Sequence, residues 1–85
     1  MSRDHAFLMH ILDEVRFLGS WSRSKDLEGL RGDPVLQRAY IRSLEVIGEA
    51  VKNLSEDLKA GHPEVEWRKM AGLRDRLIHH YFDVD

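Results

Sequence analysis

Residues 33–54 read DPVLQRAYIRSLEVIGEAVKNL, and this stretch decides the fold. It opens with a helix start, because the Asp33 side chain can accept hydrogen bonds from first-turn amides and Pro34 has the backbone angle of a first helical position. Apolar residues then recur at spacings of three and four: Leu36, Tyr40, Leu44, Ile47, Val51 and Leu54. This stripe predicts an amphipathic helix over residues 34–54.

Gly48 lies in the middle of this predicted helix. Glycine in a helix interior costs roughly 1 kcal/mol relative to alanine. The cost is offset where a second backbone approaches too closely for a side chain to fit. We therefore expect another segment of the chain to cross this helix at Gly48.

Two further apolar stripes flank the central one. Before it, the apolar residues are Phe7, Leu8, Ile11, Leu12, Val15 and Leu18. They predict a helix over residues 4–18, which Ser2 or Asp4 can cap and Gly19 can end. After it, the apolar residues are Trp67, Met70, Ala71, Leu77, Ile78 and Tyr81. They predict a helix over residues 66–82.

Between the second and third main helices, Ser55 can cap a short helix that Gly61, His62 and Pro63 then break. No stretch alternates with the period of a strand, and proline is scarce. We therefore expect an all-α protein with a single domain over residues 1–85. Three main helices joined by modest loops form an antiparallel bundle in this prediction.

The composition bounds the kind of protein. A chain of 85 residues has a marginal core, because small domains bury only about 60% of their unfolded surface. It contains no cysteine, so neither a disulfide nor a zinc–thiolate site can stabilise it, and we expect a homodimer. The first residues lack the pattern of a signal peptide, and no apolar run is long enough for a bilayer. These features predict a cytoplasmic protein without a membrane partner.

The charge is unevenly distributed along the chain. The net charge is −2, which does not indicate a nucleic-acid binder by itself. Residues 67–82 carry four bases, Arg68, Lys69, Arg74 and Arg76, against one acid, Asp75. The net charge of this segment is therefore +3 (four minus one), which leaves a net charge of −5 for the rest of the chain. Such a strip can concentrate an anionic ligand, although an ordinary solvated helix face has the same pattern.

Arg74, Asp75 and His79 suggest a chemistry for this strip. Cleavage of RNA by its own 2′-hydroxyl needs a proton acceptor, a proton donor and positive charge on the phosphate. A histidine exchanges protons near neutral pH, and a guanidinium can hold two phosphate oxygens. Asp75 lies four positions before His79, where its carboxylate can orient the ring. The alternative is a surface histidine beside a structural ion pair, and we predict no metal site because no set of spaced ligands is visible.

The segment WRKMAGLRDRLIHHY, residues 67–81, resembles the signature of HEPN domains that pair with minimal nucleotidyltransferases, the HepT-like toxins. That motif is an arginine, four residues, a histidine, one residue and a tyrosine, and it maps onto Arg74, His79 and Tyr81. Residues 44–50 (LEVIGEA), 62–64 (HPE) and 3–4 (RD) resemble the same family. The family often has asparagine where this chain has Asp75.

The resemblance implies a HEPN-type helical bundle and a metal-independent endoribonuclease without a cofactor. It implies an RNA substrate and a cognate nucleotidyltransferase antitoxin that inactivates the toxin by adding nucleotide to Tyr81 (AMPylation). Arg74 would bind phosphate, His79 would transfer protons, Asp75 would orient His79, and Tyr81 would contact substrate. Relatives continue past the motif with another helix, so we expect this bundle to lack its final helix.

One rival function fits the same residues. A non-catalytic helical dimer could partner a nucleotidyltransferase without cutting RNA. The two functions differ only in whether His79 must exchange protons. A small nucleotidyltransferase gene beside this one would favour the toxin pair.

Overall fold

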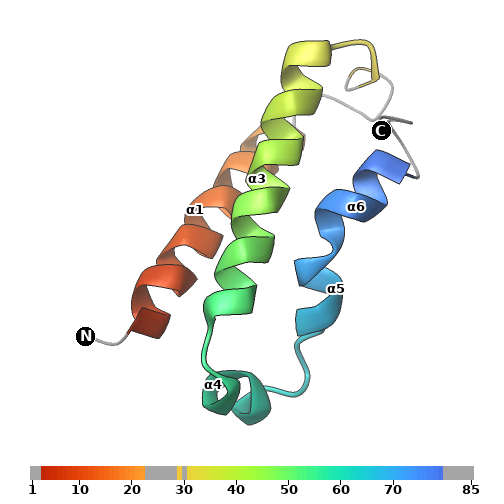
Figure 1. Cartoon of the computed structure of the whole chain (residues 1–85). Coiled ribbons are helices and arrows are strands. Elements are labelled where there is room, and N and C mark those ends of the chain that lie inside the picture. Colours follow the sequence, from red (N-terminus) through yellow and green to blue (C-terminus); the bar gives the residue numbers. More distant parts are fainter. Residues whose placement is uncertain (1–2, 23–28, 30, 80–85) are drawn as a thin grey trace.

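A computed structural model of the chain describes residues 3–22, 29 and 31–79, which are mostly helical (Figure 1). The helices are α1 (Arg3–Ser22), α3 (Pro34–Asn53), α4 (Glu56–Gly61), α5 (Trp67–Ala71) and α6 (Leu73–Leu77). No strand occurs among the described residues, which confirms the predicted all-α class. None of the helices in this part of the chain is long and apolar enough to span a bilayer.

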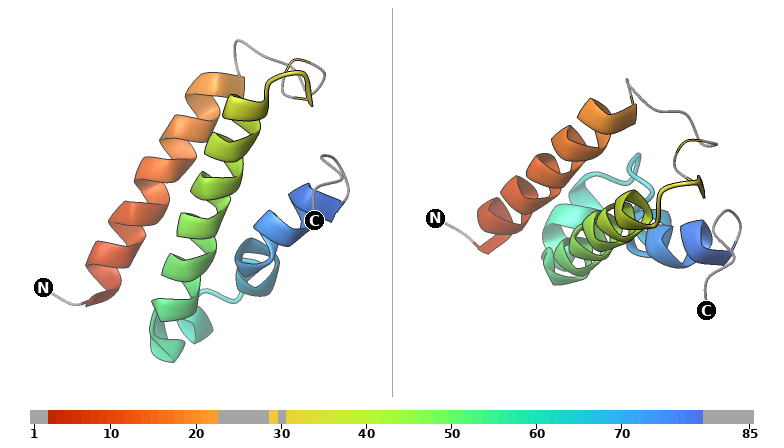
Figure 2. Two further views of the ribbon diagram at one scale, coloured as in Figure 1. Left: turned by 45° about the horizontal axis from the view of Figure 1, so that its top comes forward. Right: turned by 90° about the horizontal axis from the view of Figure 1, so that it is seen from above.

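Helix α3 lies at the centre of the molecule. Helix α1 packs along one side of it, and α5 and α6 pack along the other (Figures 1 and 2). Both flanking segments run opposite to α3, so the arrangement is antiparallel as predicted. The buried apolar residues are Leu36, Ile47, Ala50, Val51, Leu54 and Ile78. All except Ile78 belong to α3 or to its C-terminal cap, so the core is built around this one helix.

The boundaries of α3 agree with the prediction to within one residue. The Asp33 carboxylate accepts the backbone N–H of Leu36 at 3.0 Å, and Pro34 occupies the first helical position. At the other end, the N–H of the cap residue Leu54 donates to the Val51 carbonyl at 3.2 Å. Side-chain capping and the apolar stripe therefore act together on this segment.

Gly48 lies where α3 and α5 cross. A Cβ atom built on Gly48 would stand 3.0 Å from the carbonyl oxygen of Ala71 and 3.7 Å from its carbonyl carbon. Ala71 is the last residue of α5, so the backbone of that helix occupies the space that a side chain would need. The predicted close approach at Gly48 is confirmed.

The expected end of the first helix at Gly19 is wrong. Helix α1 continues through Gly19 to Ser22. A glycine ends a helix where it adopts the left-handed conformation, and Gly19 does not adopt it. The Ser20 hydroxyl donates to the Phe17 carbonyl at 2.8 Å, which satisfies one acceptor near this end.

Helix α3 covers only part of the apolar stripe of α1. Phe7, Ile11 and Leu18 are half-buried. The exposed large apolar residues of α1 are Leu8, Met9, Leu12 and Val15, which keep between 38% and 48% of their surface. Helix α1 therefore presents an uncovered apolar face.

The prediction of a single helix over residues 66–82 is also wrong, because the segment breaks at Gly72 into α5 and α6. Residues beyond His79 lie outside the described part of the chain. At the break, the Gly72 N–H is shared between the carbonyls of Arg68 and Lys69, at 3.2 Å each. The Lys69 carbonyl also accepts a hydrogen bond from the Arg76 guanidinium at 2.7 Å. A side-chain donor thus supplements the backbone donor of the Lys69 carbonyl at the break.

Polar contacts fix α1 to the rest of the molecule. The buried Ser43 hydroxyl donates to the Glu14 carboxylate at 2.6 Å. Near the start of α1, the Asp4 carboxylate accepts the N–H of Ser55 at 2.8 Å and its hydroxyl at 2.6 Å. Asp4 thus lies inside the first turn and bonds across to the cap of α4, where the sequence had suggested it as a cap of its own helix. Ser2, the other suggested cap, lies outside the described residues.

The Asp4 contact predicts an acid-sensitive contribution to stability. The two hydrogen bonds from Ser55 lower the pKa of the Asp4 carboxyl. The stabilisation is therefore complete above the ordinary pKa of about 3.9 and is lost as pH falls through the lower pKa of the folded state. Between pH 5 and pH 2.5, urea unfolding should show a smaller loss of stability for Asp4→Asn than for the parent. Asp13→Asn, an exposed change on the same helix, should follow the parent; equal losses in both variants would contradict the assignment.

Candidate functional site

Arg74 of α6 reaches across to α3 and forms the centre of the candidate site. Its Nε atom lies 3.2 Å from the Glu45 carboxylate, and its Nη1 atom donates to the Asp75 carboxylate at 2.9 Å. The Nε atom is buried, and its N–H does not point at the carboxylate oxygen, so the Glu45 contact is an ion pair without a well-aligned hydrogen bond. The guanidinium is therefore held at Nε and Nη1, while the side chain as a whole keeps 42% of its surface.

A hollow of about 270 Å³ lies beside Arg74, between α3 and the junction of α5 and α6. Its lining residues are Arg42, Leu44, Glu45, Gly48, Glu49, Lys52, Ala71, Arg74 and Asp75. We call it the Arg74 hollow. Three bases face three acids across it, so their formal charges cancel. Gly48 is one of the lining residues, so its missing side chain shapes the hollow as well as the helix crossing.

Sequence reasoning missed the contact of Glu45 with Arg74. The sequence favours ion pairs of Glu45 and Glu49 with Arg42 or Lys52, and both occur, at 3.7 Å for Arg42–Glu45 and 3.6 Å for Lys52–Glu49. The additional contact of Glu45 with Arg74 joins two helices that are distant in the sequence. No spacing along the chain signals such a contact, because it depends on how α6 packs on α3.

His79 lies at the end of the same helical segment and is exposed. Ile78 and His79 adopt the wider π-helical conformation, which is frequent at functional sites. Within the described residues, His79 makes no hydrogen bond or ion pair, and the Asp75 carboxylate bonds to Arg74. The structure therefore brings Arg74 together with Glu45 and Asp75 but leaves His79 apart from them. The orienting role of Asp75 stays a prediction.

Tyr81, the fourth predicted site residue, lies outside the described residues. Among the residues that are described, no three histidine or carboxylate side chains converge as metal ligands would. Trp67, the first residue of the third apolar stripe, is half-buried. Its indole N–H donates to the carbonyls of Lys59 at 3.2 Å and His62 at 3.1 Å, which fixes the connection between α4 and α5.

Comparison with known proteins places the chain in a family. The family model described as "Ribonuclease HepT-like" matches residues 11–85. A protein of Caldanaerobacter subterraneus subsp. tengcongensis named "Putative RNase" is 47% identical over 85 residues, covering all of this chain and 76% of that protein. One from Methanocaldococcus jannaschii with the same description is 48% identical over 80 residues, covering 94% of this chain and 66% of that protein.

A third relative, from Thermococcus cleftensis, is named "Probable ribonuclease HepT". It is 44% identical over 86 residues, which cover all of this chain and 78% of the relative. No solved structure gave a significant match. The family match covers most of the chain, and the relatives are similar over nearly its full length. The chain therefore belongs to the HepT-like ribonuclease family, a HEPN-type family.

Proposed function

We propose that the chain is a metal-independent endoribonuclease that acts as the toxin of a toxin–antitoxin pair. The observation that carries the proposal is Arg74, whose Nε atom pairs with Glu45 while its side chain lines the Arg74 hollow. Within the described residues its Nη2 group has no partner, so two N–H bonds remain for a phosphate. The ribonuclease names of the relatives point to the same chemistry.

In this mechanism the nucleophile belongs to the RNA. The 2′-hydroxyl loses its proton and its oxygen forms a bond to phosphorus, while the bond from phosphorus to the 5′ oxygen breaks and that oxygen gains a proton. Arg74 stabilises the charge on the phosphate during the exchange. His79, exposed at the end of the helical segment, transfers protons. No metal is needed to generate the nucleophile.

The partners in this proposal are a second copy of the chain and a cognate nucleotidyltransferase antitoxin, which would modify Tyr81. Two proton transfers are required, and a homodimer whose motif segments share a groove supplies two copies of His79. The small core and the uncovered apolar face of α1 also favour pairing. Sedimentation velocity at micromolar concentration should show a dimer, and a stable folded monomer would rule out this part of the proposal.

The phosphate role of Arg74 is tested by substitution. Arg74→Ala should weaken binding of single-stranded RNA and reduce the slope of log affinity against log salt by roughly 0.7, because one phosphate contact is lost. Cleavage should fall as well, and cleavage by the parent should persist in excess EDTA. Arg16→Ala, an exposed change of equal charge on α1, is the control and should alter neither slope nor rate. An unchanged slope for Arg74→Ala, or activity that needs an added divalent ion, would contradict the mechanism.

A binding module without activity is the second candidate, and one observation favours it. Two carboxylates neutralise Arg74, and no described residue orients His79. A helical dimer that recognises a nucleotidyltransferase needs neither an available Arg74 nor an oriented His79. The two candidates separate at His79, whose replacement affects cleavage only if the chain is an enzyme.

A further inference from the structure

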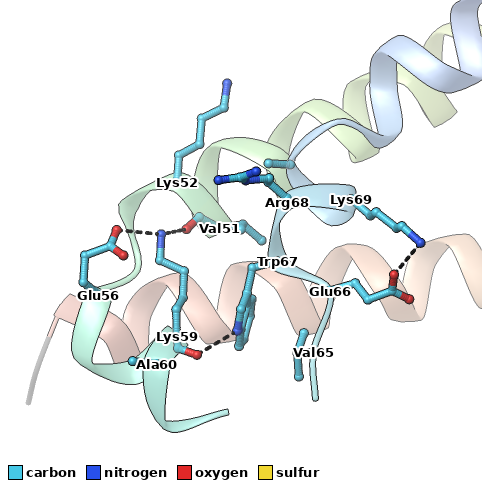
Figure 3. Close-up of a pocket in the computed structure, with 11 residues that line it drawn as sticks. Val51, Lys52, Glu56, Lys59, Ala60, Val65, Glu66, Trp67, Arg68 and Lys69 are labelled. Atoms are coloured by element: carbon cyan, nitrogen blue, oxygen red, sulfur yellow. Dashed lines mark hydrogen bonds and ion pairs between the residues drawn. The ribbon is translucent and has the colours of Figure 1, made fainter. Parts of the chain in front are cut away.

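A second, larger hollow lies beside the Arg74 hollow and is not used by the mechanism above. It has a volume of about 750 Å³ and lies between the end of α3, helix α4 and helix α5 (Figure 3). We call it the Arg68 hollow. It shares two lining residues, Lys52 and Ala71, with the Arg74 hollow, so the two hollows adjoin.

The excess of positive charge in this region lies in the Arg68 hollow. Four bases line it, Lys52, Lys59, Arg68 and Lys69, against two acids, Glu56 and Glu66. The difference is +2 (four minus two), whereas bases and acids cancel in the Arg74 hollow. An anion that reaches Arg74 is therefore attracted more strongly by the neighbouring hollow.

Arg68 is the base in this hollow that is available to a ligand. Lys52 pairs with Glu49 at 3.6 Å and Lys69 pairs with Glu66. The Lys59 ammonium lies 3.3 Å from both the Glu56 carboxylate and the Val51 carbonyl. The Arg68 side chain, by contrast, is exposed and makes no hydrogen bond or ion pair within the described residues. A guanidinium with all its N–H groups free can bind two phosphate oxygens together.

The walls of the hollow suit a nucleotide better than a simple anion. Apolar groups line it beside the cations: Val51, Ala60, Val65, Trp67 and Ala71. Figure 3 shows the Trp67 side chain between Lys59 and Val65, where its hydrogen bond to the Lys59 carbonyl is drawn. Grooves that hold single-stranded nucleic acid combine such apolar or aromatic surface with positive charge along the backbone path.

The length of the two hollows also fits a strand. Arg42 and Lys52 mark the ends of the lining stretch of α3, and ten helical residues extend about 15 Å. Lys52 lines both hollows, whereas Arg68 lines only the second. A strand with a phosphate at Arg74 can thus continue along Lys52 to Arg68.

We propose that the Arg68 hollow binds the phosphodiester backbone of single-stranded RNA next to the bond that is cut, with Arg68 as its main phosphate contact. This inference rests on the proposed function, because it takes RNA as the ligand and Arg74 as the position of the cleaved bond. Arg68 is a binding residue in this assignment and takes no part in the proton transfers.

The test measures binding of a 12-nucleotide RNA whose 2′-hydroxyls are methylated, so that it cannot be cut. Arg68→Gln should weaken binding about fivefold at 0.1 M salt and lower the salt slope by about 0.7, the values for one lost phosphate contact on a single strand. The matched control is Arg38→Gln, an exposed change of equal charge on α3 outside both hollows, and it should bind like the parent. Circular dichroism verifies that both variants fold.

Three outcomes would overturn the inference. They are equal effects of Arg68→Gln and Arg38→Gln, no binding of the blocked RNA by the parent, or binding of adenosine monophosphate as tight as that of the 12-mer, which would indicate a mononucleotide site. Failure of the proposed function would give a different result from failure of this inference. If Arg68→Gln weakens RNA binding but the parent cuts no unblocked RNA, the hollow binds RNA and the nuclease proposal alone is wrong.

Discussion

Replacing His79 by alanine is expected to abolish RNA cleavage while leaving the fold and RNA binding close to those of the parent. The His79 side chain is exposed and makes no hydrogen bond or ion pair in the described part of the chain, so its truncation breaks no polar contact there. Surface changes of this kind alter stability by no more than about 0.5 kcal/mol. A proton-transfer group contributes typically 10²- to 10⁴-fold to a rate, so cleavage should fall at least about 100-fold. A fluorogenic RNA substrate measures the rate, and circular dichroism verifies the fold.

The sequence supplies an internal control for this experiment, because His80 follows His79 directly. His80→Ala changes the same residue type one position away and should keep most of the activity. If His79→Ala cuts RNA as fast as the parent, His79 is not the proton-transfer group. If the parent cuts no RNA, the binding module becomes the better description of the chain.

Gly48→Val should lower the free energy of unfolding by about 1–3 kcal/mol, the range for inserting methyl groups into a packed contact. The first added carbon already meets the Ala71 carbonyl oxygen at 3.0 Å, and a backbone atom cannot swing away as a side-chain end can. Helix α5 must therefore move away from α3. Helix α6, which carries Arg74, follows α5 directly, so this movement should also disturb the contact of Arg74 with Glu45, and the variant should lose RNA cleavage. Thermal unfolding should show a midpoint lower by several degrees, about 4–8 °C per kcal/mol for a domain of this size.

Two variants show that the crossing, and not helix propensity, causes this loss. Gly19→Val places the same side chain inside α1, where no atom lies within 4 Å of the added Cβ, and should not lower stability. Gly48→Ala adds one carbon and gains helix propensity of roughly 1 kcal/mol, so its effect should be smaller than that of valine. Equal stability of Gly48→Val and the parent would mean that α5 does not cross α3 at this residue.

The central helix could be predicted closely because its determinants are local. Asp33 and Pro34 define its start through side-chain capping and a fixed backbone angle, and the apolar stripe defines its buried face. Gly48 was informative for a different reason. A glycine that costs stability inside an otherwise favourable helix indicates a tertiary constraint, and the crossing with α5 is that constraint.

Other features depend on tertiary contacts that no local pattern encodes. At the break at Gly72, the Arg76 side chain bonds the Lys69 carbonyl seven positions earlier, whereas the apolar stripe continues through the break. The ion pair of Glu45 with Arg74 depends on the packing of α6 on α3. The motif therefore identified Arg74 and His79 as candidates, while the carboxylate that holds Arg74 emerged only from the structure.

The shortness of α5 and α6, five residues each, has a thermodynamic consequence. Even favourable sequences need about 12–15 residues to form an isolated helix in water, so these two segments are helical because they dock on α3. A ligand that binds only the docked form raises the free energy of undocking by RT ln(1 + [L]/Kd). Ligand binding at the site and docking of α5 and α6 on α3 are therefore coupled equilibria. Phosphate bound at Arg74 would slow amide hydrogen exchange throughout α5 and α6, including at residues that never touch the ligand.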